Sequence, residues 1–131
     1  MEELVKSALA HYTEYKAEAE LYEKWLSCRD NPDIRDALII LQLKLTAIQS
    51  WFDLLNADEL FVVQKHIIEE LEWPRVAFEF SERWKNIFIR SERSLGKFQA
   101  SAFKKIIAFC NTHKEITLSL FSDLIENKTK Y

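Results

Sequence analysis

Glycine and proline are almost absent from this chain of 131 residues, which contains one Gly and two Pro. Tight turns and β-hairpins draw heavily on both residue types, so a turn-rich β-sheet protein is not expected. Gly96 alone cannot supply the repeated glycines of a P-loop or of a dinucleotide-binding motif, so a glycine-rich phosphate site is excluded as well. Hydrophobic residues nevertheless make up 48% of the chain and aromatic residues 13%, enough for a well-filled core. We expect an all-α fold.

Cysteine is also scarce, with Cys28 and Cys110 far apart in the sequence. Two isolated cysteines support neither a disulfide framework nor a zinc site, so a reducing, cytoplasmic location is expected. The first residues are acidic and do not follow the order of a signal peptide. The longest apolar stretch, residues 37–48, is interrupted by polar residues and is too short to cross a bilayer. No membrane association is expected.

Motifs that carry catalysis or bind metals are missing. His11, His66 and His113 are widely separated, and none is in an i, i+4 pair with another His, Cys or Glu that reads as a metal-binding motif. The sequence contains no nucleophilic-serine motif, and neither cysteine has a neighbouring base. We therefore expect no catalytic residue, no metal and no cofactor, and we do not expect an enzyme.

Positive charge is concentrated in the second part of the chain, although the net charge is −3. Residues 1–72 contain 7 Lys/Arg and 15 Asp/Glu, a balance of −8, whereas residues 73–131 contain 11 and 6, a balance of +5. This asymmetry is typical of a protein in which one part binds an anion. A chance distribution of charges over solvated faces is the alternative.

Apolar residues spaced three and four apart predict two long helices, over residues 2–28 and 32–55, packed as an antiparallel hairpin. Asn31 is placed to cap the second helix, and Pro32 suits its first turn. The second helix carries an additional apolar row that either the rest of the chain or a second copy must cover. We expect both, and we assign homodimerisation to that row: Ile40, Leu43, Ala47 and Trp51.

Three further helices are predicted after the hairpin, with a shorter one at the end. The third begins at Asn56, where Glu59 completes a capping box, the fourth opens at Pro74, and the fifth runs from Ser91 to about Cys110. The predicted organisation is a helical hairpin over residues 1–55, a helix-turn-helix region over 56–110, and a C-terminal helix with a frayed tail over 111–131, in which residues 127–131 are expected to fray.

The fifth predicted helix has two contrasting sides. Arg93, Lys97, Ser101 and Lys104 fall on one side, opposite a row of apolar residues. Residues 84–114 contain seven Lys/Arg and one Glu. A helix with one docked face and one cationic face suits the major groove of DNA. An ordinary amphipathic surface helix is the alternative. A membrane role is disfavoured because no large apolar face is left over for lipid.

Gly96 lies inside this predicted helix, where glycine costs about 1 kcal/mol relative to alanine. Two interpretations stay open. Either a DNA backbone approaches closely at this position, or another helix packs against it.

Three blocks of sequence resemble phage-encoded regulators of the ArpU/RinA type, which are similar to the helix-turn-helix of sigma factors that reads the −35 promoter element. The blocks are Leu55-x-x-Asp58-Glu59-x-x-Val62-Val63, Trp73-x-x-Val76-Ala77, and Arg90-Ser91-Glu92-Arg93-Ser94-Leu95-x-x-Phe98-Gln99-x-x-Ala102-x-x-Lys105-Ile106. The resemblance covers about residues 50–107. It implies a cytoplasmic activator of late genes in a bacterial host, dimeric and in contact with RNA polymerase.

The sequence departs from this family at two places. A compact helix-turn-helix joins its helices by three or four residues, often including glycine, whereas residues 85–90 form a longer connection without glycine. The family commonly has a basic or polar residue at the position of Gly96.

The predicted function is sequence-specific binding of double-stranded DNA by a transcriptional regulator. We expect contacts with phosphates to set the register and contacts with base edges to read the sequence. The expected phosphate contacts are Arg83, Lys85, Arg90 and Lys105; the expected base contacts are Arg93, Ser94, Lys97 and Ser101, with Ser91 and Lys104 completing the interface. This prediction requires that the protein's own carboxylates do not occupy these side chains. The alternative function is a phage-encoded helical adaptor or inhibitor that binds a host protein.

Overall fold

A computed structural model of the chain describes residues 1–83 and 92–129, with side chains up to residue 125. All regular structure in this part is helical, which confirms the all-α fold class. The elements are α1 (Glu2–Ala10), α2 (Tyr12–Cys28), α3 (Pro32–Phe52), α4 (Ala57–Val62), the π-helical turn η1 (Val63–Ile68), α5 (Trp73–Arg83), α6 (Glu92–Thr112), α7 (Lys114–Leu120) and α8 (Ser122–Thr129). Across these residues, no helix combines the length and apolar character needed to span a bilayer.

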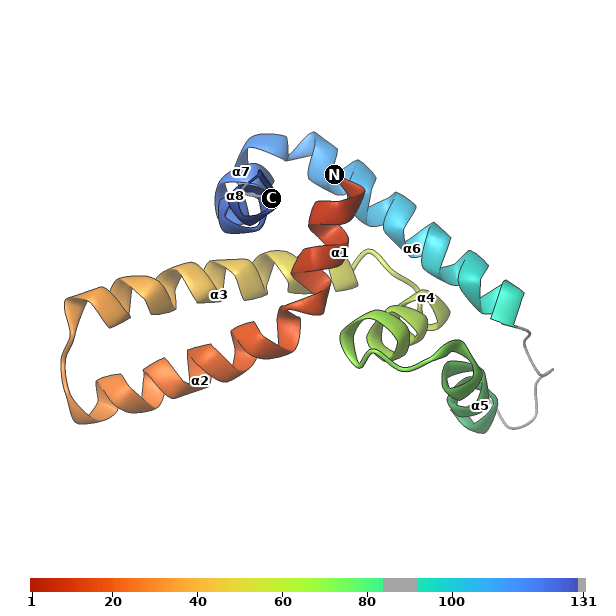
Figure 1. Cartoon of the computed structure of the whole chain (residues 1–131), viewed down its shortest axis with the longest axis horizontal. Coiled ribbons are helices and arrows are strands. Elements are labelled where there is room, and N and C mark those ends of the chain that lie inside the picture. Colours follow the sequence, from red (N-terminus) through yellow and green to blue (C-terminus); the bar gives the residue numbers. More distant parts are fainter. Residues whose placement is uncertain (84–91, 130–131) are drawn as a thin grey trace.

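Helices α2 and α3 form an antiparallel hairpin that projects from the rest of the molecule (Figure 1). The α3 N-terminus is built as predicted. The Asn31 side chain accepts hydrogen bonds from the backbone N–H groups of Asp33 and Ile34, at 3.0 and 3.2 Å, and Pro32 occupies the first turn. These bonds satisfy backbone donors that have no partner inside the helix. The hairpin turn is therefore fixed by local sequence.

The predicted single helix over residues 2–28 is wrong, because the chain bends at His11 between α1 and α2. Helix α1 buries Val5, Ala8 and Leu9 and packs against η1, α6 and α8, whereas α2 packs along α3. One straight helix could not satisfy both sets of contacts. At the bend, the Nδ1 atom of His11 lies 2.8 Å from the carbonyl oxygen of Ser7.

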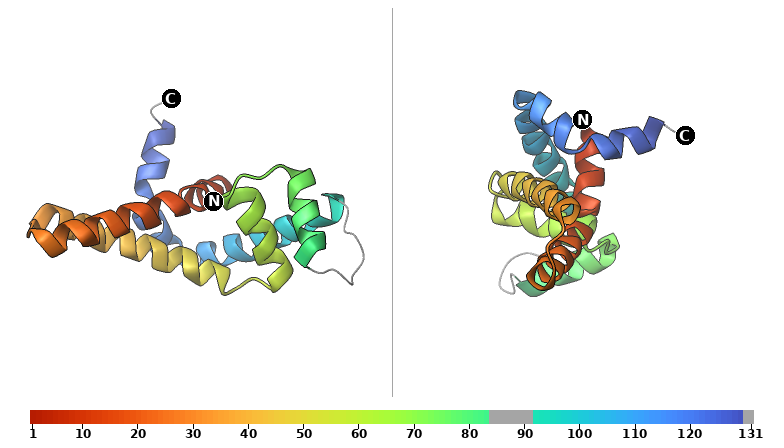
Figure 2. Two further views of the ribbon diagram at one scale, coloured as in Figure 1. Left: turned by 90° about the horizontal axis from the view of Figure 1, so that it is seen from below. Right: turned by 90° about the vertical axis from the view of Figure 1, so that its left-hand side faces the viewer.

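The main hydrophobic core joins the hairpin to the remaining helices. It contains residues of α1, α2, α3, η1 and α6, together with Phe121 between α7 and α8. Figure 2 shows α1 in the middle of this arrangement, with the hairpin on one side and α4, α5 and α6 on the other. The core therefore crosses the boundary that the sequence places between residues 1–55 and 56–110.

A second, smaller core holds α4, α5 and α6 together. Phe61 and Val62 of α4, Val76 and Phe80 of α5, and Leu95 of α6 are its buried residues. The Phe61 and Phe80 rings meet edge to face, with centroids 5.6 Å apart. This core packs against the N-terminal half of α6. The helix lies along one edge of the molecule (Figure 1).

The C-terminal segment forms two helices, α7 and α8, where one short helix is predicted. The stretch expected to fray begins at residue 127, but α8 continues to Thr129; residues 130–131 lie outside the described residues. Lys44 of α3 connects this segment to the hairpin, because its Nζ atom lies 3.1 Å from a carboxylate oxygen of Asp123.

Candidate nucleic-acid interface

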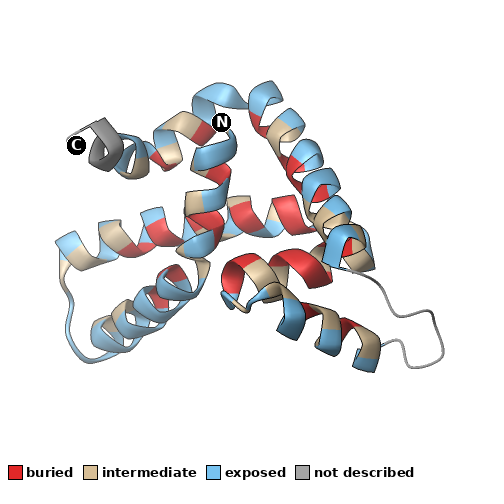
Figure 3. Ribbon diagram, turned by 45° about the vertical axis from the view of Figure 1, so that its right-hand side comes forward, coloured by how far each residue is buried: buried red, intermediate tan, exposed pale blue. Residues whose placement is uncertain are grey.

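Helix α6 has a buried side and an open side along its whole length (Figure 3). Leu95, Ala102 and Ile106 are completely buried, and Phe103 and Cys110 follow them into the core. Burial of this row orients the helix, because the remaining positions must then face outward. The open side is the one on which the sequence predicts contacts with DNA.

Three cations lie on the open side of α6. Arg93, Lys97 and Lys104 are exposed, and none of them forms an ion pair or hydrogen bond with another described residue. Their spacings of four and seven residues place them on one stripe of the helix, about 16 Å long at 1.5 Å per residue. We call these three residues the cationic stripe. Glu2 of α1 lines the same shallow depression as Lys104, so an acidic residue lies at one end of the stripe.

Ser101 and Lys105 bind a carboxylate within the chain and are not free for DNA. The Ser101 hydroxyl donates to one carboxylate oxygen of Glu59, and the Lys105 ammonium donates to the other, each at 2.6 Å. The prediction that both side chains are free to meet a base or a phosphate is therefore wrong. Glu59 is 1% exposed, and a buried carboxylate requires such partners. The interface predicted from sequence is smaller by these two residues.

Glu59 also closes the capping box of α4. Its carboxylate accepts from the backbone N–H of Asn56, and the Asn56 side chain accepts from the backbone N–H of Glu59, both at 2.9 Å. Burial pushes the pKa of Glu59 up, but the hydrogen bonds from Asn56, Lys105 and Ser101 outweigh it and hold the pKa below its ordinary value. The sequence predicts the capping box but not the second role of Glu59, in which it anchors the middle of α6.

The other predicted DNA contacts have different surroundings. Arg83 ends α5 with its guanidinium carbon 5.3 Å from the centre of the Phe61 ring, within range of a cation–π contact. Ser94 is partly buried and already has an interaction within the chain. Lys85, Arg90 and Ser91 lie outside the described residues.

Gly96 has open space beside it. Among the described residues, no heavy atom lies within 4 Å of the position that a Cβ atom on Gly96 would take, beyond its own helix backbone and chain neighbours. Close packing against another helix, one of the two interpretations of this glycine, is therefore wrong. Close approach of a DNA backbone stays a prediction.

His66, a residue to which the sequence assigns no role, helps to fix α6. Its Nδ1 atom lies 2.6 Å from the side-chain oxygen of Gln99, and its ring stacks on Trp73 with centroids 3.8 Å apart. The contact joins η1 to the start of α5 and to the middle of α6. His66 and Gln99 are 33 positions apart in the sequence, so only the fold brings them together.

The residues predicted to form a dimer do not make a single exposed row. Ile40 and Leu43 are each 50% exposed, and Ala47 is partly buried. Trp51 is only 1% exposed, with its ring centroid 5.5 Å from that of Phe121. Placing Trp51 in an exposed dimer row is therefore wrong, because the C-terminal segment covers it within the same chain.

The described residues contain no group of three or more His, Cys, Asp or Glu side chains that could hold a metal ion. Cys28 and Cys110 are both free, with Cys28 exposed and Cys110 buried. No protein-family model matches the chain, and no match is found among the curated proteins or the solved structures.

Proposed function

We propose that the cationic stripe of α6 binds the phosphate backbone and groove edges of double-stranded DNA. The observation that carries this proposal is the set of three exposed cations, Arg93, Lys97 and Lys104, on one side of a helix whose other side is buried. Each positive side chain that replaces counterions on DNA makes binding more favourable and more dependent on salt. The contact set excludes Ser101 and Lys105, which Glu59 holds.

In this proposal α4, α5 and α6 act as the helix-turn-helix, with α6 as the recognition helix. Arg93 and Lys97 lie toward the α6 N-terminus, the end that contacts bases in such motifs. Lys104 lies two turns farther on and would contact a phosphate. Glu59, Gln99 and His66 would keep the helix in one position, which a base-reading surface requires.

A role in transcription rests on the resemblance to ArpU/RinA-type regulators. The resemblance implies a protein of the bacterial cytoplasm that acts at phage late promoters, next to RNA polymerase. The acidic first part of the chain would repel phosphate and so limit binding to unrelated DNA. A dimer would present two copies of α6 to two half-sites, and its remaining apolar contacts would be Ile40 and Leu43.

To test this proposal, the full chain would select duplexes that it binds from a random library. The selected duplex would then be titrated with the parent and the variants. Arg93→Ala and Lys97→Ala should each weaken binding by about 1–3 kcal/mol if they contact bases. Lys24→Ala, which removes an exposed cation on α2, is the matched control and should have little effect. No enriched sequence, or equal losses in all three variants, would contradict the proposal.

A second candidate function is an adaptor or inhibitor that binds a host protein. It is favoured by the exposed apolar side chains of the hairpin: Leu21, Trp25, Ile39, Ile40 and Leu43, which are 44–62% exposed. Exposed apolar groups that lie close together often mark protein interfaces. Replacing Ile40 and Leu43 by Ser separates the two candidates, since an adaptor would lose its partner while non-specific binding of DNA by a monomer would persist.

A further inference from the structure

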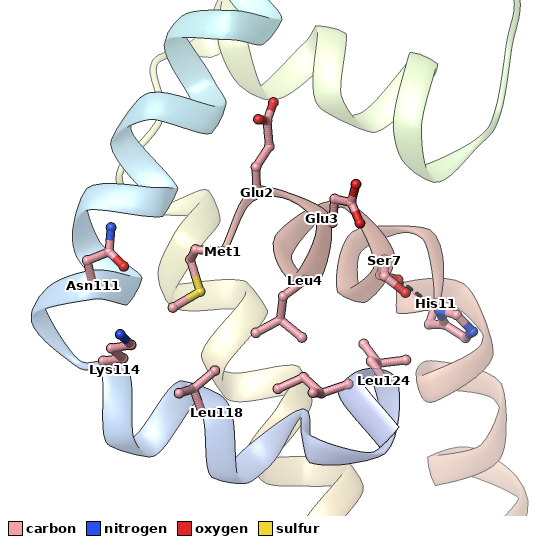
Figure 4. A pocket seen from close by; sticks show the side chains of 11 residues that line it. Met1, Glu2, Glu3, Leu4, Ser7, His11, Asn111, Lys114, Leu118 and Leu124 are labelled. Carbon is pink, nitrogen blue, oxygen red and sulfur yellow. Dashed lines mark hydrogen bonds between the residues drawn. The ribbon is translucent and has the colours of Figure 1, made fainter. Parts of the chain in front are cut away.

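A cavity of about 820 Å³ lies between α1, the junction of α6 with α7, and α8 (Figure 4). Its size is within the range of about 300–1,000 Å³ typical of sites for small organic molecules. Apolar side chains form its centre: Met1, Leu4, Leu118, Leu124 and Ile125. The cationic stripe does not line it, but the cavity shares Glu2 and Asn111 with the shallow depression beside Lys104, so it adjoins one end of the proposed interface with DNA.

Two hydrogen-bond donors lie together at one end of the cavity. Asn111 lies in the last turn of α6, and Lys114 begins α7 (Figure 4). Neither side chain has an ion pair or hydrogen bond with another described residue. The carboxylates of Glu2 and Glu3 stand on the rim and point away from the apolar centre (Figure 4). An ammonium and an amide N–H₂ can both donate to one carboxylate.

We propose that this cavity binds an aliphatic carboxylate, with the chain against Leu4, Leu118 and Leu124 and the head group between Asn111 and Lys114. The apolar centre supplies affinity in proportion to the chain that it removes from water. The two donors supply the preference for an anion over a neutral polar head. This proposal does not depend on the binding of DNA.

The test is calorimetric titration of the full chain with octanoate, decanoate and dodecanoate below their micellar concentrations, beside the alcohols of equal length. We expect one saturable site per chain. Affinity should rise roughly fourfold for each added methylene until the cavity is filled. Each carboxylate should bind about fivefold more tightly than its alcohol because of the charge-assisted hydrogen bonds. Binding that does not saturate, or equal affinity for acid and alcohol, would overturn the proposal.

Matched substitutions on α7 locate the site. Leu118→Asp places a charge in the apolar centre and should abolish binding of the carboxylates. Ile116→Asp makes the same change at a side chain that is 62% exposed and does not line the cavity, so it should leave binding unchanged. Leu4→Trp offers a second way to block the cavity, by bulk rather than charge, should Leu118→Asp fail to fold. Equal losses in Leu118→Asp and Ile116→Asp, or unchanged binding in a folded Leu4→Trp variant, would contradict the location.

Lys114→Met tests the head group. This change keeps the length of the side chain but removes its charge, so carboxylate affinity should fall to that of the alcohol while alcohol affinity stays the same. Lys6→Met, at an exposed position of α1 outside the cavity, is the control. An unchanged preference for carboxylate in Lys114→Met would overturn the assignment of the head-group site.

Discussion

The Nζ atom of Lys105 lies 2.6 Å from the Oε1 atom of Glu59, although the two residues are 46 positions apart in the sequence. Lys104, the preceding residue, is exposed and has no ion pair or hydrogen bond with another described residue. Two adjacent lysines on α6 therefore have different surroundings. One connects the helix to α4, and the other belongs to the cationic stripe.

This difference predicts opposite effects of the same substitution. Lys105→Met should lower the free energy of unfolding by about 1 kcal/mol, because it leaves a buried carboxylate with one donor fewer. The cost stays modest because Lys105 is 43% exposed and water screens the pair. Lys104→Met should leave stability within about 0.5 kcal/mol of the parent and weaken binding to duplex DNA instead. Urea denaturation would measure the stability of both variants, and titration with duplex would measure their affinity for DNA. Equal stability and equal affinity in the two variants would refute the prediction.

Glu59 predicts a loss of stability in acid. Its pKa is lower in the folded protein than the ordinary value of 4.5, so the unfolded chain takes up a proton first as the pH falls. The stabilisation is therefore fully present above pH 4.5 and is lost as the pH drops toward the lower pKa of the folded state. Glu59→Gln should flatten the dependence of unfolding free energy on pH in this window. Glu92→Gln, at an exposed position on α6, is the control; an equally flat profile in that variant would contradict the assignment.

Gly96→Ala should stabilise the protein by about 0.5–1 kcal/mol, since the added methyl group meets no atom of the part of the chain that the structure describes and alanine favours the helix. Thermal unfolding would measure this gain. The same variant tests why glycine is present. If a DNA backbone approaches closely here, the more stable variant should bind duplex more weakly, and unchanged binding would remove that interpretation.

Tyr15 predicts a loss of stability in alkali. Burial and the nearby carboxylates, Asp123 first among them, raise the pKa of Tyr15 from 10.0 to about 12. Between these values the unfolded chain has released the proton and the folded chain keeps it, so stability falls as the pH rises. The Tyr15 hydroxyl is buried and has no hydrogen-bond partner among the described residues, so Tyr15→Phe should also stabilise the protein by about 1 kcal/mol at neutral pH. Unfolding curves from pH 7 to 12 would show both effects; a Tyr15→Phe variant with the parent's alkaline profile would refute the first.

The sequence predicts the features of this fold that depend on neighbouring residues. The cap at Asn31 and the capping box of Asn56 with Glu59 are confirmed because their partners are two or three residues away. The apolar row of α6 is also confirmed, since helical spacing alone decides which residues share a face.

Contacts between distant segments could not be predicted in this way. The burial of Trp51 depends on Phe121, and the bend at His11 depends on contacts of α1 with α6 and η1. Lys105 lies in the same basic segment as Lys104, and no Asp or Glu lies within four residues of it in the sequence to indicate a partner. Only the position of Glu59 in the fold makes one lysine an anchor and leaves the other exposed.

The salt dependence of binding to a generic duplex shows whether the cations of α6 contact the phosphates of DNA. It needs no knowledge of a specific site, and the slope of log affinity against log salt concentration reports the number of phosphates neutralised. Each cation that contacts a phosphate should contribute roughly 0.9 to the magnitude of that slope. The triple variant Arg93→Ala/Lys97→Ala/Lys104→Ala should therefore lower it by up to about 3. A variant with the parent's slope and affinity, or a parent that binds no duplex at low salt, would show that α6 is not a surface for DNA.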